Sequence, residues 1–193
     1  MRSSACVAYE LKKTVVLVGM MGAGKTAVGT ALARLLNVPF IDQDDEIERA
    51  ANRTIAEIFR DHGEPFFRQK ETQVLERLLS AKPMVLSTGG GAYLQERNRD
   101  LIGSHATALW LDAPLDLLWA RVRHRTTRPL LMTSDPYQTL ADMVKVRTPF
   151  YAQAPIHVRA EHNRSVEDMA KKVRDTLAEH PEVLKANNHV QSN

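Results

Sequence analysis

The chain has 193 residues, of which 44% are hydrophobic and 25% are charged, with a net charge of +3. This composition is typical of a folded globular protein and excludes global disorder, and the length suits one domain with a sizeable core. The single cysteine, Cys6, excludes an internal disulfide, and no apolar run approaches the roughly 20 residues of a membrane helix. We therefore expect a cytoplasmic protein without a membrane partner.

Apolar runs and helical patterns alternate along the chain. TVVLVG at 14–19 is β-branched and ends in glycine, which predicts a buried strand, and apolar residues at helical spacing predict a helix over 25–36. Further strands are expected at 38–42, 83–91, 106–111 and 155–160, and further helices from Thr54, over 65–80, from Pro114, from Pro136 and over 166–179. This alternation predicts an α/β fold: a three-layer α/β/α sandwich around a five-stranded parallel sheet. We expect one domain over 12–180, with 1–11 and 181–193 as flexible termini.

The segment GMMGAGKT at 19–26 directly follows the first predicted strand and matches the pattern G-x-x-x-x-G-K-[ST]. Glycines let backbone N–H groups converge on phosphate oxygens, and the following helix directs its positive end at the same anion. Lys25 can reach the β- and γ-phosphates, and the Thr26 hydroxyl can bind Mg²⁺. A chance glycine-rich turn is the alternative, but a strand before and a helix after favour a nucleotide site. The expected ATP contacts from this loop are Gly22, Ala23, Gly24, Lys25, Thr26 and Ala27.

Two aspartates, Asp42 and Asp44, follow the second predicted strand, one residue apart. Beside a phosphate loop, one aspartate can hold a Mg²⁺-bound water and another can accept a proton from a substrate hydroxyl. The alternative is that acids simply decorate a helix N-terminus, which is the interpretation we give to Asp45 and Glu46.

Two other segments call for an explanation. STGGG at 87–91 follows a strand, and three consecutive glycines would let the backbone lie flat against a ligand. RVRHRTTR at 121–128 is basic without an acid, so a nucleic-acid-binding arm is an alternative to a phosphate-binding role. Because the carboxyl ends of parallel strands share one edge, we expect the phosphate loop, the aspartates and the glycines to meet there.

Six segments, in this order, resemble those of the shikimate kinase family: GMMGAGKT, DQDDEIE, GEPFFRQKE, STGGG, RPLL and RTPFY. The resemblance covers about residues 12–180. It implies a P-loop fold of the nucleoside-monophosphate-kinase type with a mobile lid, here at about 123–135. It also implies transfer of the γ-phosphate of ATP to the 3-hydroxyl of shikimate, with Mg²⁺, in aromatic amino-acid biosynthesis.

The resemblance implies a role for each matching residue. Arg68 and Arg147 would bind the substrate carboxylate, and the backbone of Gly90 would approach the substrate. Asp44 would hold ring hydroxyls and accept the proton, while Asp42 would orient Mg²⁺ through water. Arg128 would close over the phosphates, Arg121 would flank adenine, and Arg164 would contact the nucleotide in a loop that matches loosely. Lys25, Asp44 and Arg128 form the expected catalytic set.

Independently of the family, Glu71 lies one helical turn after Arg68 and is well placed to orient its guanidinium. Arg123, His124 and Arg125 receive no role.

Two other functions stay open at this point. Another small-metabolite P-loop kinase, such as a gluconate kinase, would keep the phosphate loop but has no reason to keep Asp44, Arg68 and Arg147 together. A nucleotide-sensing or nucleic-acid-binding module would not need the full catalytic set. We expect shikimate and ATP as partners, no nucleic acid, and a monomer.

Overall fold

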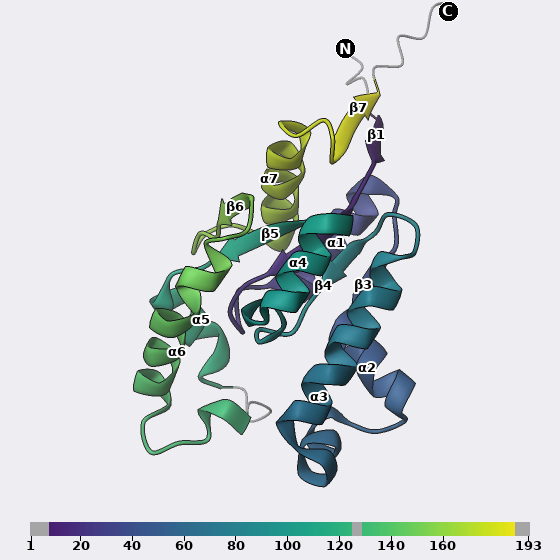
Figure 1. Ribbon diagram of the computed structural model, residues 1–193. Helices are drawn as coiled ribbons and strands as arrows, with labels where there is room; N and C mark the ends of the chain where they lie inside the picture. The colour runs from purple at the N-terminus through teal and green to yellow at the C-terminus, as the bar shows by residue number, and fades with distance from the viewer. Residues whose placement is uncertain (1–7, 125–128, 188–193) are drawn as a thin grey trace, which may run out of the picture.

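The computed structural model describes residues 8–124 and 129–187. A five-stranded parallel sheet with the strand order β3-β4-β2-β5-β6 forms its centre, and helices cover both faces (Figure 1). Its strands are β2 (Thr14–Val18), β3 (Phe40–Asp42), β4 (Val85–Ser87), β5 (Ala106–Asp112) and β6 (Ile156–Arg159). The expected α/β sandwich with five parallel strands is confirmed.

Seven α-helices and two short 3₁₀ helices accompany the strands in the described residues. They are α1 (Lys25–Leu36), α2 (Gln43–Ala51), α3 (Ile55–Leu79), η1 (Ala92–Leu94), α4 (Glu96–His105), α5 (Leu115–Val122), η2 (Pro129–Leu131), α6 (Pro136–Tyr151) and α7 (Val166–Ala178). Helices α1 and α7 pack together on one face of the sheet, and α4 packs against β5 on the other. The sequence analysis did not foresee α4, which is short and has a mainly polar sequence. None of the helices in the described ranges is long and apolar enough to cross a membrane.

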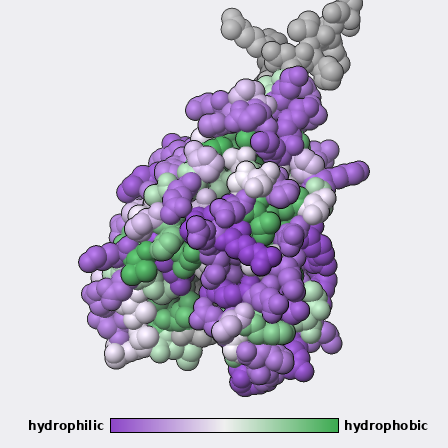
Figure 2. Space-filling view, viewed as in Figure 1, coloured by the Kyte–Doolittle hydropathy of each residue, from purple (hydrophilic) through white to green (hydrophobic). Residues whose placement is uncertain are grey.

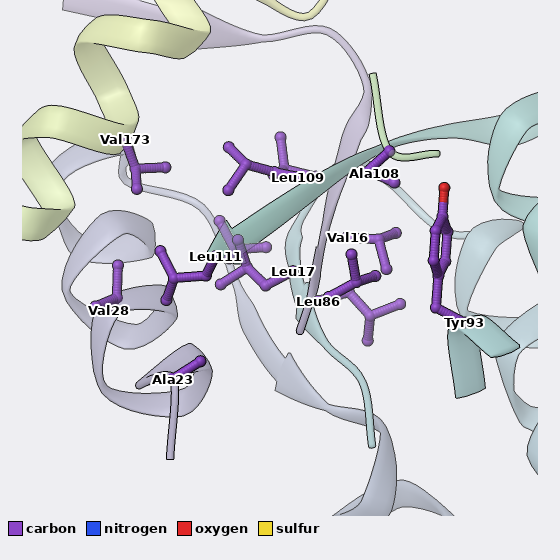
Figure 3. Close-up of a cluster of buried hydrophobic side chains, with 14 of the residues drawn as sticks. Val16, Leu17, Ala23, Val28, Leu86, Tyr93, Ala108, Leu109, Leu111 and Val173 are labelled. Carbon is purple, nitrogen blue, oxygen red and sulfur yellow. The ribbon is translucent and has the colours of Figure 1, made fainter. Parts of the chain in front are cut away.

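The core lies on both faces of β2, whose five residues are all buried. In Figure 3, Leu17 lies on the side of Val28 and Val173, which belong to α1 and α7, whereas Val16 lies on the side of Tyr93. Successive strand residues point to opposite faces, so a strand covered on both sides is apolar along nearly its whole length. Burial of each apolar side chain contributes about 1.5–3 kcal/mol. The one polar residue of β2, Thr14, is also buried and accepts a hydrogen bond from the backbone N–H of Met84.

The strand order reverses direction around β2, which lies between β4 and β5. In parallel sheets, the crevice for ligands lies at the carboxyl ends of the strands where the order reverses. The phosphate loop follows β2, Asp42 ends β3 with Asp44 two residues later, and the three glycines follow β4. The structure therefore confirms that these three segments share one edge of the sheet.

Helix α3 combines the two helices that the sequence predicts from Thr54 and over 65–80. Its N-terminus carries the expected capping box, in which Thr54 and Glu57 each bind the backbone N–H of the other. The two parts meet at Gly63, which has φ 77° and ψ 175°, a conformation that favours glycine. Pro65 follows in the first turn of the second part, where a missing N–H costs little.

The two ends of the described chain pair with each other. β1 (Ala8–Leu11) and β7 (Leu184–Asn187) form an antiparallel two-stranded sheet beside the main sheet (Figure 1). The predicted domain limits, 12–180, leave out both strands, each of which is only 4 residues long. The outermost parts of the expected flexible termini, 1–7 and 188–193, lie outside the described residues.

Two helical glycines test how tightly the helices pack. A β-carbon at Gly29 of α1 would lie 2.6 Å from Cε2 of Phe40 and 2.8 Å from Cδ1 of Leu17, whereas one at Gly103 of α4 would meet nothing within 4 Å. We expect Gly29→Ala to lower the free energy of unfolding by about 1–3 kcal/mol through overpacking. Gly103→Ala is the matched control and should raise it by about 0.5–1 kcal/mol, because alanine favours the helix. Urea titration of both variants measures the difference, and equal effects would contradict the described packing.

Candidate active site

The phosphate loop needs its glycines for close packing as well as for its turn. Gly19, Gly22 and Gly24 all have positive φ. A β-carbon at Gly19 would lie 2.8 Å from the carbonyl oxygen of Leu111, and one at Gly22 would lie 2.7 Å from Cγ1 of Val122. Larger residues at these positions would push the loop away from β5 and α5. The loop therefore has one conformation, with its amides at the N-terminus of α1.

Two cationic side chains fix this loop. Nζ of Lys25 donates to the carbonyl oxygens of Gly19 and Met20, at 2.8 and 3.0 Å, which holds the ammonium over the turn. Nη1 of Arg121 donates to the carbonyl oxygens of Gly22 and Ala23, both at 3.1 Å. Arg121, expected to flank adenine, thus binds the loop backbone and also lines the adjacent cleft.

A hydroxyl and a carboxylate meet at the start of α1. Oγ1 of Thr26 donates to Oδ2 of Asp42 at 3.1 Å, although the two residues follow different strands. The other Asp42 oxygen caps α2 by accepting from the backbone N–H of Asp44, at 3.1 Å. Mg²⁺ prefers oxygen ligands and commonly takes one or two from the protein, the others being water and phosphate. The Thr26 and Asp42 oxygens fit such an ion.

The Asp44 carboxylate is the most strongly perturbed acid beside the phosphate loop. Burial and the negative charge of Asp42 raise its pKa to about 6, although Lys25 partly opposes the rise. A shift of this kind, in a cleft and with identified charged neighbours, is typical of functional carboxylates. Asp45, one residue further on, is exposed, which supports its interpretation as an ordinary helix N-terminal acid.

The three consecutive glycines bring three side chains together. A β-carbon at Gly89 would lie 2.8 Å from Oδ1 of Asp44, and one at Gly91 would lie 2.6 Å from Nη2 of Arg68. At Gly90 a β-carbon would lie 3.2 Å from Nη1 of Arg147. Each glycine thus makes room for one of the charged groups that the sequence assigns to the acceptor. The three side chains come from α2, α3 and α6.

Carboxylates hold the Arg68 guanidinium on two sides. Nη1 donates to both oxygens of Glu71 at 3.0 Å, which confirms the orienting role expected of that residue. Nε and Nη2 donate to one oxygen of Glu64, at 3.2 and 3.1 Å. Glu71 is only 1% exposed, and burial raises its pKa although Arg68 opposes the rise. Glu64 was missed by the sequence analysis, but its spacing of four residues from Arg68 could have indicated it.

Three further polar side chains support the site, those of Gln43, Asn98 and Tyr151, and the sequence analysis did not find them. Buried Gln43, between the two aspartates, donates from Nε2 to the backbone oxygen of Glu71 at 2.8 Å and so ties α2 to α3. Asn98 accepts from Thr72 of α3 at 2.8 Å and donates to the oxygen of Ala92, just past the glycines. Pairings between distant segments leave no local pattern in the sequence. The third side chain is Tyr151, the last residue of the segment RTPFY. Its spacing of four residues from Arg147 could have indicated that the two side chains lie close together.

A cleft of about 850 Å³ opens beside the phosphate loop and reaches Asp44 and Gly90, whereas Arg68 and Arg147 are not among its lining residues. Its lining includes residues 22–28 of the loop and α1, Asp42, Asp44, 87–90, Arg121 and Arg164. Arg164 pairs with Glu161 at 2.7 Å on the rim, so the structure brings it to the nucleotide side. Arg128 and Arg125 lie outside the described residues. In Figure 2, hydrophilic residues gather between the α3 region and the α5–α6 region.

The fold and the site define the class of protein. A phosphate loop at the edge of a parallel sheet, beside a carboxylate whose pKa is raised, is typical of a P-loop kinase. Comparison with known proteins narrows the class. The family profile described as shikimate kinase matches residues 21–178, and the chain belongs to the shikimate kinase family.

Individual relatives agree with this assignment. The shikimate kinase of Cereibacter sphaeroides is 61% identical over 92% of this chain and 89% of its own length, and that of Ruegeria pomeroyi is 54% identical over 92% and 91%. Among solved structures, a shikimate kinase from Acinetobacter baumannii in complex with shikimate is 40% identical, with a TM-score of 0.80 over 86% of this chain and 93% of that one. A gluconokinase from Sinorhizobium meliloti shares the fold at 16% identity, with a TM-score of 0.58.

The raised pKa of Asp44 has a consequence for stability. In the folded protein Asp44 binds its proton more tightly than in the unfolded chain, so stability falls as the pH rises from about 4 through about 6. We expect Asp44→Asn, without Mg²⁺ or nucleotide, to raise the free energy of unfolding at pH 7.5 by about 1–3 kcal/mol. The gain should shrink towards zero at pH 4. Urea titrations at both pH values measure it.

Asp45→Asn is the matched control for this measurement. It removes the neighbouring carboxylate, which is exposed, and should change stability much less. A gain for Asp44→Asn that persisted at pH 4, or an equal gain for Asp45→Asn, would contradict the electrostatic explanation.

Proposed function

We propose that the protein transfers the γ-phosphate of ATP to the 3-hydroxyl of shikimate, giving shikimate 3-phosphate and ADP in aromatic amino-acid biosynthesis. One observation carries the proposal: Asp44, Arg68 and Arg147 converge on Gly89, Gly90 and Gly91 at the edge of the sheet that holds the phosphate loop. An acid and two cationic forks suit a polyol that also bears a carboxylate.

In this proposal Arg68 and Arg147 bind the substrate carboxylate. Arg68 is already oriented by two carboxylates, so little side-chain entropy remains to be lost on binding. The backbone of Gly90 lies beside Arg147 and can approach the substrate because it carries no side chain. Binding through charged hydrogen bonds at one end of the molecule would leave the hydroxyls directed at Asp44.

Asp44 is proposed to hold the ring hydroxyls and to accept the proton of the one that attacks. With a pKa of about 6, its carboxylate is mostly ionised at neutral pH and is still basic enough to take a proton. Phosphoryl transfer has a loose transition state, so positioning of the hydroxyl can matter as much as removal of its proton.

On the nucleotide side, residues 22–27 and Lys25 are proposed to bind the phosphates, with Arg121 and Arg164 nearer the base. When bound, Mg²⁺ neutralises charge on the phosphates; Thr26 would hold it directly and Asp42 through water. Arg128, in the proposed lid at 123–135, would supply a further cation to the transferred group. That residue lies outside the described part of the chain.

The rival interpretations lack such support. The likeness to a gluconokinase is at 16% identity and bears on the fold alone. A nucleotide-sensing or nucleic-acid-binding module would have no use for two arginines and an acid packed on three glycines. We further propose a cytoplasmic monomer without nucleic-acid or membrane partners.

A coupled ADP-release assay tests the function directly. With Mg·ATP, we expect rapid ADP release on addition of shikimate, and much slower release with gluconate or without an acceptor. Only an acceptor that engages both arginines places its hydroxyl at Asp44. Equal turnover of gluconate, or release independent of shikimate, would contradict the proposal.

The carboxylate clamp is tested by Arg68→Ala. A charged hydrogen bond contributes roughly 1.5–3 kcal/mol, so we expect shikimate to bind about 10- to 150-fold more weakly. The affinity for ATP should barely change, and calorimetric titration of each ligand separates the two. Arg77→Ala removes an exposed arginine from the same helix, where it pairs with Glu46, and should alter neither affinity. Parallel loss of shikimate and ATP binding in Arg68→Ala would exclude the clamp.

A further inference from the structure

The hydroxyl of Tyr151 lies buried where three segments of the site meet. Tyr151, at the end of α6, is 1% exposed and packs near the ring of Trp110 in β5, with 6.2 Å between the ring centroids. Its hydroxyl donates to the carbonyl oxygen of Gly90 at 2.5 Å and lies 3.8 Å from Sδ of Met20 in the phosphate loop. A buried hydroxyl with polar partners from other segments constrains all of them, because leaving it unpaired is costly.

Arg147 lies one turn before Tyr151 on the same face of α6. Burial raises the pKa of the Tyr151 hydroxyl, while the nearby Arg147 guanidinium opposes the rise. The hydroxyl thus donates to Gly90 on the side from which the Arg147 guanidinium approaches this glycine. A β-carbon at Gly90 would lie 3.2 Å from Nη1 of Arg147 and 3.5 Å from the hydroxyl, so all three groups are in close contact.

The same contacts lead to the phosphate loop. The carbonyl oxygens of Gly19 and Met20 bind Lys25, and that of Gly19 would lie 3.7 Å from a β-carbon at Gly90. Through Gly90 and Met20, Tyr151 therefore links the loop that holds Lys25 to the arginine that would hold the acceptor. An error of about 1 Å between acceptor and donor can cost a kinase most of its rate.

We propose that Tyr151 is a positioning residue, whose hydroxyl fixes Arg147 relative to the phosphate loop and so sets where the acceptor carboxylate is held. The proposal rests on the proposed function, because Tyr151 acts only through Arg147. It assigns a role to the last residue of RTPFY, and it explains why a tyrosine, rather than an apolar residue, fills this buried position.

Tyr151→Phe tests the role, because it removes one oxygen and keeps the ring. Without the hydroxyl beside it, Arg147 should hold the acceptor carboxylate less accurately, and we expect a KM for shikimate about tenfold higher. The KM for ATP should stay within about twofold, because the loop keeps its bonds to Lys25 and Arg121. Tyr93→Phe, at the other buried tyrosine of the described chain, is the matched control and should leave both constants unchanged.

The amide of shikimate provides a sharper readout, because it has no carboxylate for Arg147 to bind. Tyr151→Phe should change the KM for this amide by less than about twofold. When Tyr151→Phe is combined with Arg147→Ala, it should raise the KM for shikimate little beyond the increase caused by Arg147→Ala alone. An unchanged KM for shikimate, equal losses for shikimate and its amide, or an equal loss for ATP would overturn the proposal. So would a Tyr151→Phe protein that no longer unfolds cooperatively, since the hydroxyl would then be structural. Failure of the wild-type protein to phosphorylate shikimate would instead refute the proposed function.

Discussion

The packing of three charged side chains onto Gly89, Gly90 and Gly91 is the constraint on which the rest of the site depends. A side chain at Gly89 or Gly91 would overlap Asp44 or Arg68, with contacts of 2.8 and 2.6 Å. The helices that carry these groups would then have to move apart. Because the glycines directly follow β4, the neighbour of β2, their position also fixes the acceptor groups relative to the phosphate loop. The absence of side chains at three positions thus determines where two substrates would meet.

The charged groups around these glycines are costly to the fold. Burial raises the pKa of Asp44 to about 6, and Glu71 is a nearly fully buried carboxylate paired with Arg68. Desolvation of such pairs often outweighs their mutual attraction, so they add little to stability. What they do provide is geometry: both oxygens of Glu71 hold one edge of the guanidinium, and Glu64 holds another. A preoriented arginine can then bind an anion without first having to be ordered.

Buried polar contacts carry this geometry from one helix to the next. Gln43 ties α2 to α3 through the backbone of Glu71, and its other side-chain atom, Oε1, has no partner in the described chain. An unpaired buried oxygen of this kind lowers stability. Its presence beside Asp44 agrees with a side chain that serves to position α2 and not to stabilise the fold. Asn98 joins α3 to the segment after the glycines in the same way. The elements that would bind the acceptor are therefore braced against each other as well as against the sheet.

The sequence by itself determined the sheet and the phosphate loop. Both depend on local patterns: β-branched runs, helical spacing, and glycines ahead of a Lys-Thr pair. The roles expected of Asp44, Arg68 and Arg147 followed from the resemblance of six segments to a known family. Even the pairing of Arg68 with Glu71 follows from their spacing on one helix.

Only the tertiary structure decided which charged side chain lies on which glycine. It also decided that Arg121 binds backbone carbonyl oxygens of the phosphate loop, and that the two ends of the described chain pair as strands. It also decided the high pKa of Asp44, which depends on burial and on Asp42 and Lys25. These features join residues far apart in the chain. Their energies depend on distance and desolvation in the folded state, and no periodicity in the sequence records them.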